Sequence, residues 1–146
     1  MSDQPKKKKV ILLVGLPRSG KSTWARRVGV PIVNPDSVRL ALHGQAFIVE
    51  AEPMVWSMAQ YMLRALLLAG HDHVIVDATN TSVKRREMWI SRTGEWETYY
   101  RHIDTPLDVC ISRAGDNKPL VEAIHRMNNS YEPVTIEEGI HLLEEV

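Results

Sequence analysis

The sequence is poor in several features that would commit a protein to a specialised class. Its 146 residues contain one cysteine, Cys110, which excludes a disulfide framework and a cysteine metal site. Lysine and arginine together number 18, as do aspartate and glutamate, so no net charge draws the protein toward nucleic acid or membrane. No apolar stretch is long enough to cross a bilayer. We therefore expect one globular domain in the cytoplasm.

Four consecutive lysines, residues 6–9, precede an apolar run at 10–14. This arrangement superficially resembles a signal peptide, but the run is too short and charged residues follow it at once. We interpret residues 1–8 as a solvated basic tail and residues 9–146 as a single domain. The alternative is that the lysines contact phosphates.

Apolar runs alternate with helical patterns along the chain, which is typical of a parallel sheet with crossover helices. Strands are expected at 10–14, 31–34, 73–76 and 96–103. Helices are expected at 21–28, 36–43, 52–69, 83–92, 107–113 and 120–127, with a capped segment at 135–146. The predicted fold class is α/β, a mostly parallel sheet of four or five strands flanked by helices, with a small lid near 114–119.

The predicted helix 52–69 carries apolar residues at helical spacing, among them Met58 and Met62. We interpret these methionines and Trp56 as core packing and not as a cofactor site. Cys110 lies in an amphipathic pattern and is interpreted in the same way.

Residues 15–22 read Gly-Leu-Pro-Arg-Ser-Gly-Lys-Ser and fit the P-loop pattern G-x-x-x-x-G-K-[ST]. The motif lies between a predicted strand and a predicted helix, the context that it requires. Its backbone amides and the helix N-terminus suit an anion. We expect Lys21 to reach the β- and γ-phosphates of ATP and Ser22 to ligate Mg²⁺. The predicted ATP site comprises Gly15, Pro17, Arg18, Ser19, Gly20, Lys21, Ser22 and Thr23.

Asp36 and Arg39 follow the second predicted strand, at the carboxyl edge of the sheet where ligands bind in open α/β folds. A carboxylate there can accept the proton of an attacking hydroxyl. Arg39 shares its helix face three residues later. We predict that this pair activates and orients the phosphate acceptor, with a plain helix N-cap as the alternative for Asp36.

Asp77 ends the next apolar run and is predicted to hold magnesium together with Ser22, or to anchor the P-loop. Asp77, Thr79 and Asn80 lie at the same predicted edge and are candidates for binding the acceptor.

Three of the arginines in the second half of the chain bear on the site. Arg113 precedes a polar, glycine-containing break, where a lid would carry it onto the transferring phosphate. The alternative is a surface arginine at a helix end. We expect at least one of Arg85 and Arg86 to be a surface residue without a catalytic role. The predicted catalytic set is therefore Lys21, Asp36, Arg39 and Arg113.

The chain resembles the polynucleotide 5′-kinase-like family of P-loop kinases from about Lys9 to its C-terminus. The segments that carry the resemblance are 15–26, 33–39, 74–80 with Arg86 and Trp89, Arg113 before Pro119, and 131–133 with 138–139. The resemblance implies that Asp36 is the general base, that Arg39 contacts the acceptor side and that Arg113 contacts the ATP phosphates from a lid. Ser37 departs from the phage enzyme, which carries an aspartate after its base.

These observations predict an ATP- and magnesium-dependent kinase that phosphorylates a hydroxyl group, with a polynucleotide 5′-hydroxyl as the leading acceptor. Two alternatives stay open. One is a kinase of a small hydroxylated molecule, such as a nucleoside, a sugar or an antibiotic. The other is a nucleotide-binding module that phosphorylates nothing. The expected partners are ATP and a nucleic-acid 5′ end or small substrate, with no membrane.

Overall fold

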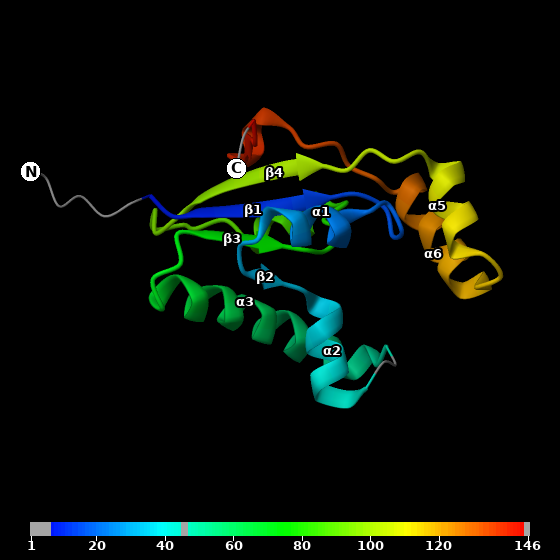
Figure 1. Ribbon diagram of the computed structural model, residues 1–146, viewed down its shortest axis with the longest axis horizontal. Helices are drawn as coiled ribbons and strands as arrows, with labels where there is room; N and C mark the ends of the chain where they lie inside the picture. The colour runs from blue at the N-terminus through cyan, green and yellow to red at the C-terminus, as the bar shows by residue number, and fades with distance from the viewer. Residues whose placement is uncertain (1–6, 45–46, 145–146) are drawn as a thin grey trace, which may run out of the picture.

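A five-stranded parallel sheet forms the centre of the protein, as seen in a computed structural model that describes residues 7–44 and 47–144 (Figure 1). The strands are β1 (Lys9–Val14), β2 (Ile32–Val33), β3 (His73–Val76), β4 (Glu97–His102) and β5 (His141–Leu142). The α-helices are α1 (Lys21–Val28), α2 (Pro35–His43), α3 (Glu52–Leu68), α4 (Val83–Glu87), α5 (Leu107–Ala114) and α6 (Lys118–Asn129). Two 3-10 helices, η1 (Val49–Ala51) and η2 (Ile136–Glu138), join them.

The strand order is β2-β3-β1-β4-β5, with β1 at the centre. Val10 of β1 is opposite Val74 of β3 and Thr98 of β4, and the pairs advance in parallel register from there. Because all strands run in one direction, their carboxyl ends meet at a single edge, beside α5 and α6 (Figure 1). The loops after β1, β2, β3 and β4 therefore converge there, and these loops carry the predicted site.

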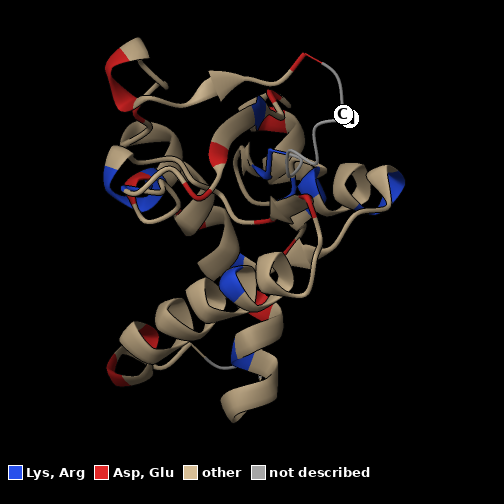
Figure 2. Ribbon diagram, turned by 90° about the vertical axis from the view of Figure 1, so that its left-hand side faces the viewer, with Lys and Arg blue, Asp and Glu red and all other residues tan. Residues whose placement is uncertain are grey.

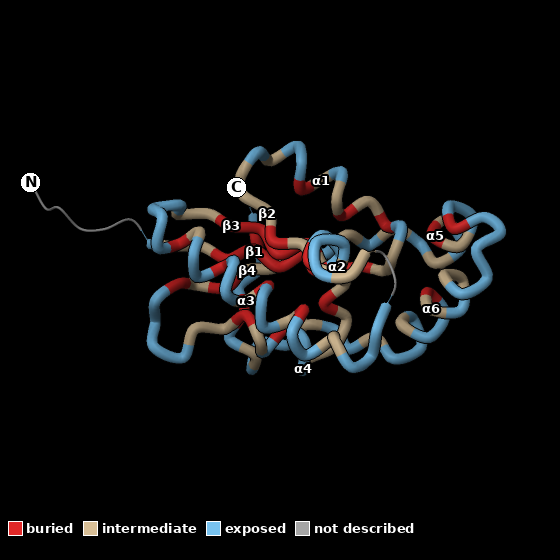
Figure 3. Tube along the Cα trace, turned by 90° about the horizontal axis from the view of Figure 1, so that it is seen from below, coloured by how far each residue is buried: buried red, intermediate tan, exposed pale blue. Residues whose placement is uncertain are grey.

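Alternating residues of β1 face two separate cores, because successive side chains of a strand point to opposite faces. Val10 and Leu12 pack with α3 and Trp89 on one face. Ile11 and Leu13 pack with Ala25 of α1 and with Leu143 on the other. Figure 3 shows buried residues concentrated in these central strands. Covering both faces explains why β1 is a continuous apolar run.

A third, smaller core joins α5 to α6 beyond the edge of the sheet. Cys110, Ala114 and Ile124 are buried in it, and burial raises the pKa of the Cys110 thiol. Cys110 is thus a small core residue, as predicted. The break at 115–117 forms the turn between α5 and α6, at the place of the predicted lid, and α6 begins at Lys118 instead of Leu120 because Asn117 caps it.

Several predicted boundaries were wrong, each for a local or tertiary reason. The N-cap of α2 is Asn34, whose Oδ1 accepts from the amides of Asp36 and Ser37 at 2.8 and 3.3 Å, so Asp36 is not the cap. Helix α4 ends at Glu87 instead of Arg92, and the chain then places Trp89 in the core.

The end of the chain and the outer face of α3 also differ from expectation. Residues 135–144 form η2 and the short strand β5 instead of one capped segment, although the capping box of Thr135 and Glu138 is present. The methionines of α3 are not core residues: Met54, Met58 and Met62 are exposed. Trp56 does pack against the core, half-buried.

Lysines of the predicted basic tail contact the protein where they are described. Lys7 pairs with Glu97 at 2.8 Å, and the Nζ atom of Lys8 donates to the backbone carbonyl of Leu67 at 2.5 Å. Residues 1–6 of that tail lie outside the described residues. In the part of the chain that the structure describes, no helix combines the length and the apolar character that a membrane span requires.

Candidate active site

The P-loop connects β1 to α1 and has a backbone that few residues could adopt. The amide of Gly15 donates to the carbonyl of Thr79 at 3.0 Å, which ties the start of the loop to the end of β3. A Cβ atom on Gly15 would lie 2.7 Å from the carbonyl oxygen of Ile103, closer than real Cβ contacts come. Gly20 has φ 103°, and Arg18 is one of two non-glycine residues with positive φ among those described. The loop is therefore held in a strained, pre-formed shape.

Lys21 is buried at the first turn of α1, with its Nζ 2.6 Å from the carbonyl oxygen of Leu16 and 3.3 Å from Ser19 Oγ. Burial lowers the pKa of Lys21 to about 8, while the carboxylates of Asp77 and, more weakly, Asp36 act in the opposite direction. A cation so poorly solvated gains strongly from a phosphate group. Asp77 and Asp36, the two predicted carboxylates, therefore both lie close enough to Lys21 to interact with its charge.

Asp77 lies directly beside Ser22. Its Oδ2 accepts from Ser22 Oγ at 2.7 Å and from Asn34 Nδ2 at 3.2 Å. Hydroxyl and carboxylate oxygens are ligands that Mg²⁺ prefers, usually with phosphate oxygens and water completing its shell. The two residues thus fit the predicted magnesium site. The described residues contain no group of three or more His, Cys, Asp or Glu that could hold a metal.

Asp36 presents its carboxylate to solvent at the start of α2, with its side chain 87% exposed. Arg39 Nη1 donates to Asp36 Oδ1 at 2.6 Å. Glu52 of α3 binds the other edge of the guanidinium group: Arg39 Nε donates to Glu52 Oε2 at 2.9 Å, and Arg39 Nη2 donates to Glu52 Oε1 at 2.6 Å. These bonds to Glu52 raise the pKa of Arg39 and lower that of Glu52. Glu52 therefore fixes Arg39, which in turn holds Asp36.

Sequence reasoning missed Glu52, because 13 residues separate it from Arg39 and no local pattern joins them. It also missed the contact between Arg85 and Trp56, where the guanidinium carbon lies 3.9 Å from the ring centroid. Arg39 lies 5.8 Å from the same ring. Burial lowers the pKa of Arg85. A half-buried aromatic ring with two guanidinium groups within about 6 Å of its centroid is thus part of the site, on the side of Asp36.

Arg86, in contrast, is a structural residue. It is fully buried and pairs with Glu138 of η2 at 2.7 Å, which is also buried in large part. Its Nη1 donates to the carbonyl of Asn80 at 2.9 Å. Asn80 is itself buried, with φ 47°, and its Nδ2 donates to the carbonyl of Leu13 at 2.8 Å. Asn80, predicted to bind the acceptor, thus holds the loop after β3 against β1.

The remaining predicted residues lie around the P-loop. Arg113, in the last turn of α5, donates from Nη1 to the carbonyl of Arg18 at 3.0 Å and so sits against the loop. Thr105 Oγ1 donates to the carbonyl of Ser19 at 2.6 Å. Pro17 and Thr79 are half-buried, and Arg18 and Thr23 are exposed. Arg113 therefore reaches the P-loop, as its predicted role requires.

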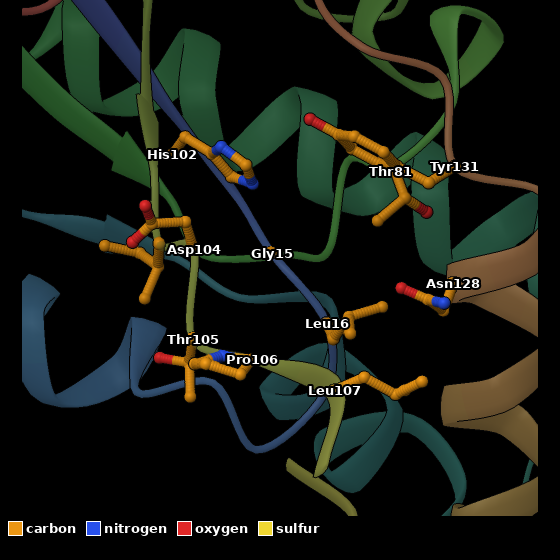
Figure 4. Close-up of a pocket in the computed structure, with 11 residues that line it drawn as sticks. Gly15, Leu16, Thr81, His102, Asp104, Thr105, Pro106, Leu107, Asn128 and Tyr131 are labelled. Atoms are coloured by element: carbon orange, nitrogen blue, oxygen red, sulfur yellow. The ribbon is translucent and has the colours of Figure 1, made fainter. Parts of the chain in front are cut away.

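A cavity of about 220 Å³ adjoins the start of the P-loop (Figure 4). Gly15 and Leu16 line it together with the segment after β4, from His102 to Leu107. Thr81, Asn128 and Tyr131 close it on the side of α6. His102 and Tyr131 stack, with ring centroids 5.7 Å apart. No local sequence pattern indicates this cavity, because four segments that are distant along the chain build it.

Comparisons with known proteins bear on the family and the fold. The family described as an AAA domain (AAA_33) matches residues 10–132. A chain of the Pnkp1/Rnl/Hen1 complex is 29% identical with a TM-score of 0.66, over 77% of this chain and 41% of that one. This chain thus spans about two fifths of the length of that relative.

Two further structures share the fold along nearly their whole length. The APS kinase of Mycobacterium tuberculosis, in complex with AMPPNP and APS, is 19% identical with a TM-score of 0.62, over 97% of this chain and 92% of that one. A sugar kinase from a Janibacter species is 20% identical with a TM-score of 0.62, over 94% and 85%. The predicted α/β fold of the P-loop kinase type is confirmed. Since the family match takes in most of the chain, the protein belongs to this AAA domain family of P-loop proteins.

Proposed function

We propose that the protein transfers the γ-phosphate of ATP to a hydroxyl group, and that the acceptor is the 5′-hydroxyl of a polynucleotide. The observation that carries the proposal is the exposed carboxylate of Asp36, held by Arg39 and Glu52 within electrostatic reach of the P-loop lysine. A carboxylate that only capped a helix would not need this support. An exposed, oriented carboxylate near a phosphate-binding loop suits a general base.

The proposed step is an in-line displacement. The acceptor oxygen bonds to the γ-phosphorus as its proton passes to a carboxylate oxygen of Asp36, and the bond to the bridging oxygen breaks to release ADP. Lys21 and Arg113 neutralise charge on the transferring group. Ser22 and Asp77 would hold Mg²⁺, which supplies further neutralisation of the phosphate oxygens when bound.

The polynucleotide acceptor draws support from the 29%-identical chain of the Pnkp1/Rnl/Hen1 complex. Arg85, which lies over the Trp56 ring, also suits it, since a guanidinium group can bind a phosphodiester. Arg85 makes no ion pair within hydrogen-bonding distance among the described residues, so its charge is available.

A small hydroxylated acceptor is the second candidate. The charges sum to zero, and Figure 2 shows acidic and basic residues interspersed over the fold instead of gathered into a basic face. Polynucleotide binding commonly relies on such a face. Neighbours with this fold include an APS kinase and a sugar kinase.

The test is transfer of labelled γ-phosphate from ATP to a 5′-hydroxyl oligonucleotide. Lys21→Ala should abolish transfer, and Asp36→Asn should reduce kcat by about 100-fold or more while ATP binding persists. Asp108→Asn is the matched control, because Asp108 is also an exposed aspartate in the first turn of a helix.

Each outcome separates the candidates. Transfer that depends on Lys21 and Asp36 supports the polynucleotide kinase. ATP binding without transfer to the oligonucleotide favours a small acceptor, to be sought among metabolites. If Asp36→Asn leaves every detected phosphotransfer unchanged, Asp36 is not the base. If no hydroxyl compound accepts phosphate, the protein is a nucleotide-binding module.

A further inference from the structure

The outer face of α3 is apolar although it faces solvent. Met54, Met58, Tyr61, Met62 and Leu68 are exposed on this helix, and we call these five residues the α3 patch. Their spacing places them along one side of the helix. Tyr61 is 72% and Leu68 87% exposed. The opposite side of α3 carries Val55, Ala59, Leu63 and Leu67, which are buried against the sheet. A surface helix of a monomer usually has a polar outer face, so α3 is unusual.

Charge is almost absent from this helix. Of its 17 residues, only Glu52 and Arg64 are charged at neutral pH. Glu52 is bound to Arg39, and Arg64 lies 3.5 Å from Glu95 and stacks over Trp96. The patch residues themselves are therefore uncharged, and the charge beside them, Arg64, is directed to Glu95.

Exposed apolar side chains are also frequent in the segment that precedes α3. Of the twelve exposed large apolar side chains among the described residues, ten lie between residues 40 and 68. Beyond the patch these are Leu40, Leu42, Phe47, Ile48 and Val49. The other two, Ile136 and Leu142, lie in η2 and β5. Scattered apolar residues are normal on a protein surface, but this concentration marks an interaction site.

We infer that the α3 patch is the interface of a homodimer, in which α3 packs against α3 of a second copy about a two-fold axis. Head-to-tail association would need a second apolar surface of similar extent, and the described residues outside 40–68 offer only Ile136 and Leu142. Association of the patch with itself needs no second surface and closes at two copies. The patch residues carry no charge and the neighbouring Arg64 is paired with Glu95, so two copies meet without strong repulsion.

Other classes of occupant fit this face less well. Nucleic acid is bound through lysine and arginine, and an interfacial membrane helix carries a basic rim. The only basic residue of α3, Arg64, is already engaged with Glu95. Methionines suit a protein partner, since their flexible side chains adapt to a neighbouring apolar surface.

The α3 patch supplies the centre of a dimer interface, and the exposed apolar side chains near it supply the remaining area. Helix α3 is about 25 Å long. At roughly 100 Å² per exposed large side chain, the patch contributes about 500 Å² and the ten described apolar side chains between residues 40 and 68 together roughly 1,000 Å². A standard stable interface needs about 800 Å² from each partner. The interface thus requires the patch together with part of its surroundings.

Sedimentation equilibrium of the full chain tests the inference without reference to catalysis. The wild type should have twice the 16.6 kDa chain mass, with a Kd below about 10 µM. The double variant Tyr61→Glu, Leu68→Glu should weaken dimerisation at least about 100-fold, because it places like charges at the interface. The matched control is Ile136→Glu, Leu142→Glu, which also changes two exposed apolar residues and should leave the dimer intact.

A second measurement does not depend on the folding of the charged variant. Tyr61 lies near the middle of α3, where the two helices of the proposed dimer would cross at the two-fold axis. The two cysteines of a Tyr61→Cys dimer should therefore be close enough for a short bismaleimide to cross-link the copies. Ile136→Cys should not cross-link. A wild-type monomer at about 100 µM, an open series of larger assemblies, or a dimer that the charged variant leaves unchanged would each overturn the inference. A monomer would leave the patch to a different protein.

Discussion

The buried ion pair between Arg86 and Glu138 allows a quantitative test of how the site is supported. The Arg86 side chain has no exposed surface, and Glu138 carboxylate oxygens accept from its Nε at 2.7 Å and Nη2 at 3.2 Å. Glu138→Gln removes the negative charge and leaves the buried guanidinium without its partner. Breaking such a pair on one side costs about 3–5 kcal/mol of unfolding free energy. Since domains have about 5–15 kcal/mol in total, the loss is large.

The expected effect also depends on pH. Burial is the largest influence and opposes ionisation of Glu138, but the hydrogen bonds from Arg86 and Thr135 together with the charge of Arg86 outweigh it and lower the pKa of Glu138. A carboxyl group whose folded pKa is depressed stabilises the fold above its unfolded pKa and loses that contribution as pH falls through the folded value. The difference in stability between wild type and Glu138→Gln should therefore shrink under acidic conditions.

Urea unfolding at neutral and acidic pH measures both effects, with Glu137→Gln as the matched control because Glu137 is the exposed neighbour. The double variant Arg86→Met, Glu138→Leu should recover most of the lost stability, since it removes both buried charges. A loss below about 1 kcal/mol for Glu138→Gln at neutral pH would refute the reasoning. A second consequence is functional. Arg86 donates to the carbonyl of Asn80, and Asn80 donates to the carbonyl of Leu13 in β1, the strand that leads into the P-loop. The ATP affinity of Glu138→Gln should therefore fall as well.

Two further predictions concern the P-loop. Gly15→Ala places a Cβ atom 2.7 Å from the Ile103 carbonyl oxygen and 2.8 Å from Ser19 Oγ, so it should cost about 1–3 kcal/mol and weaken ATP binding. Urea unfolding and nucleotide titration measure these effects, and an unchanged ATP affinity would contradict them. Lys21→Met should abolish phosphotransfer yet raise stability at pH 7, because it removes a buried charge. With the folded pKa lowered from 10.5 to about 8, wild-type stability should rise with pH between these values and the variant should lack this rise. Thermal melts over that pH range measure this difference. If the stability of the wild type and of Lys21→Met changed equally with pH, the assigned burial of Lys21 would be wrong.

The P-loop region was predictable because its information is local. The apolar run of β1, the glycine-rich turn and α1 follow one another along the chain, and α1 has the bounds that the sequence predicted. The position of Asp77 also followed from local pattern, since the end of a buried parallel strand must lie at the sheet edge. Its contact with Ser22 is a consequence of the β1–β3 register.

Contacts across the sequence were not predictable in the same way. The spacing of α3 indicated an apolar helix but not which apolar side is buried, so Met58 and Met62 were assigned to the core. The position of Asp36 suggested a helix cap, and only the backbone geometry at Asn34 shows which residue bonds the free amides. The sequence pattern of residues 83–92 predicted a longer helix, but α4 ends at Glu87 and Trp89 packs in the core.

By itself, then, the sequence determined the fold class, the nucleotide-binding loop and the residues that follow the strands, because these depend on short-range spacing and strand direction. Only the tertiary structure decided what each charged residue does. It paired Arg86 with Glu138 in the interior, and it placed Arg39 between Asp36 and Glu52. The physical reason is that the energy of a charged group depends on its burial and its partners, and packing brings those partners together from distant parts of the chain.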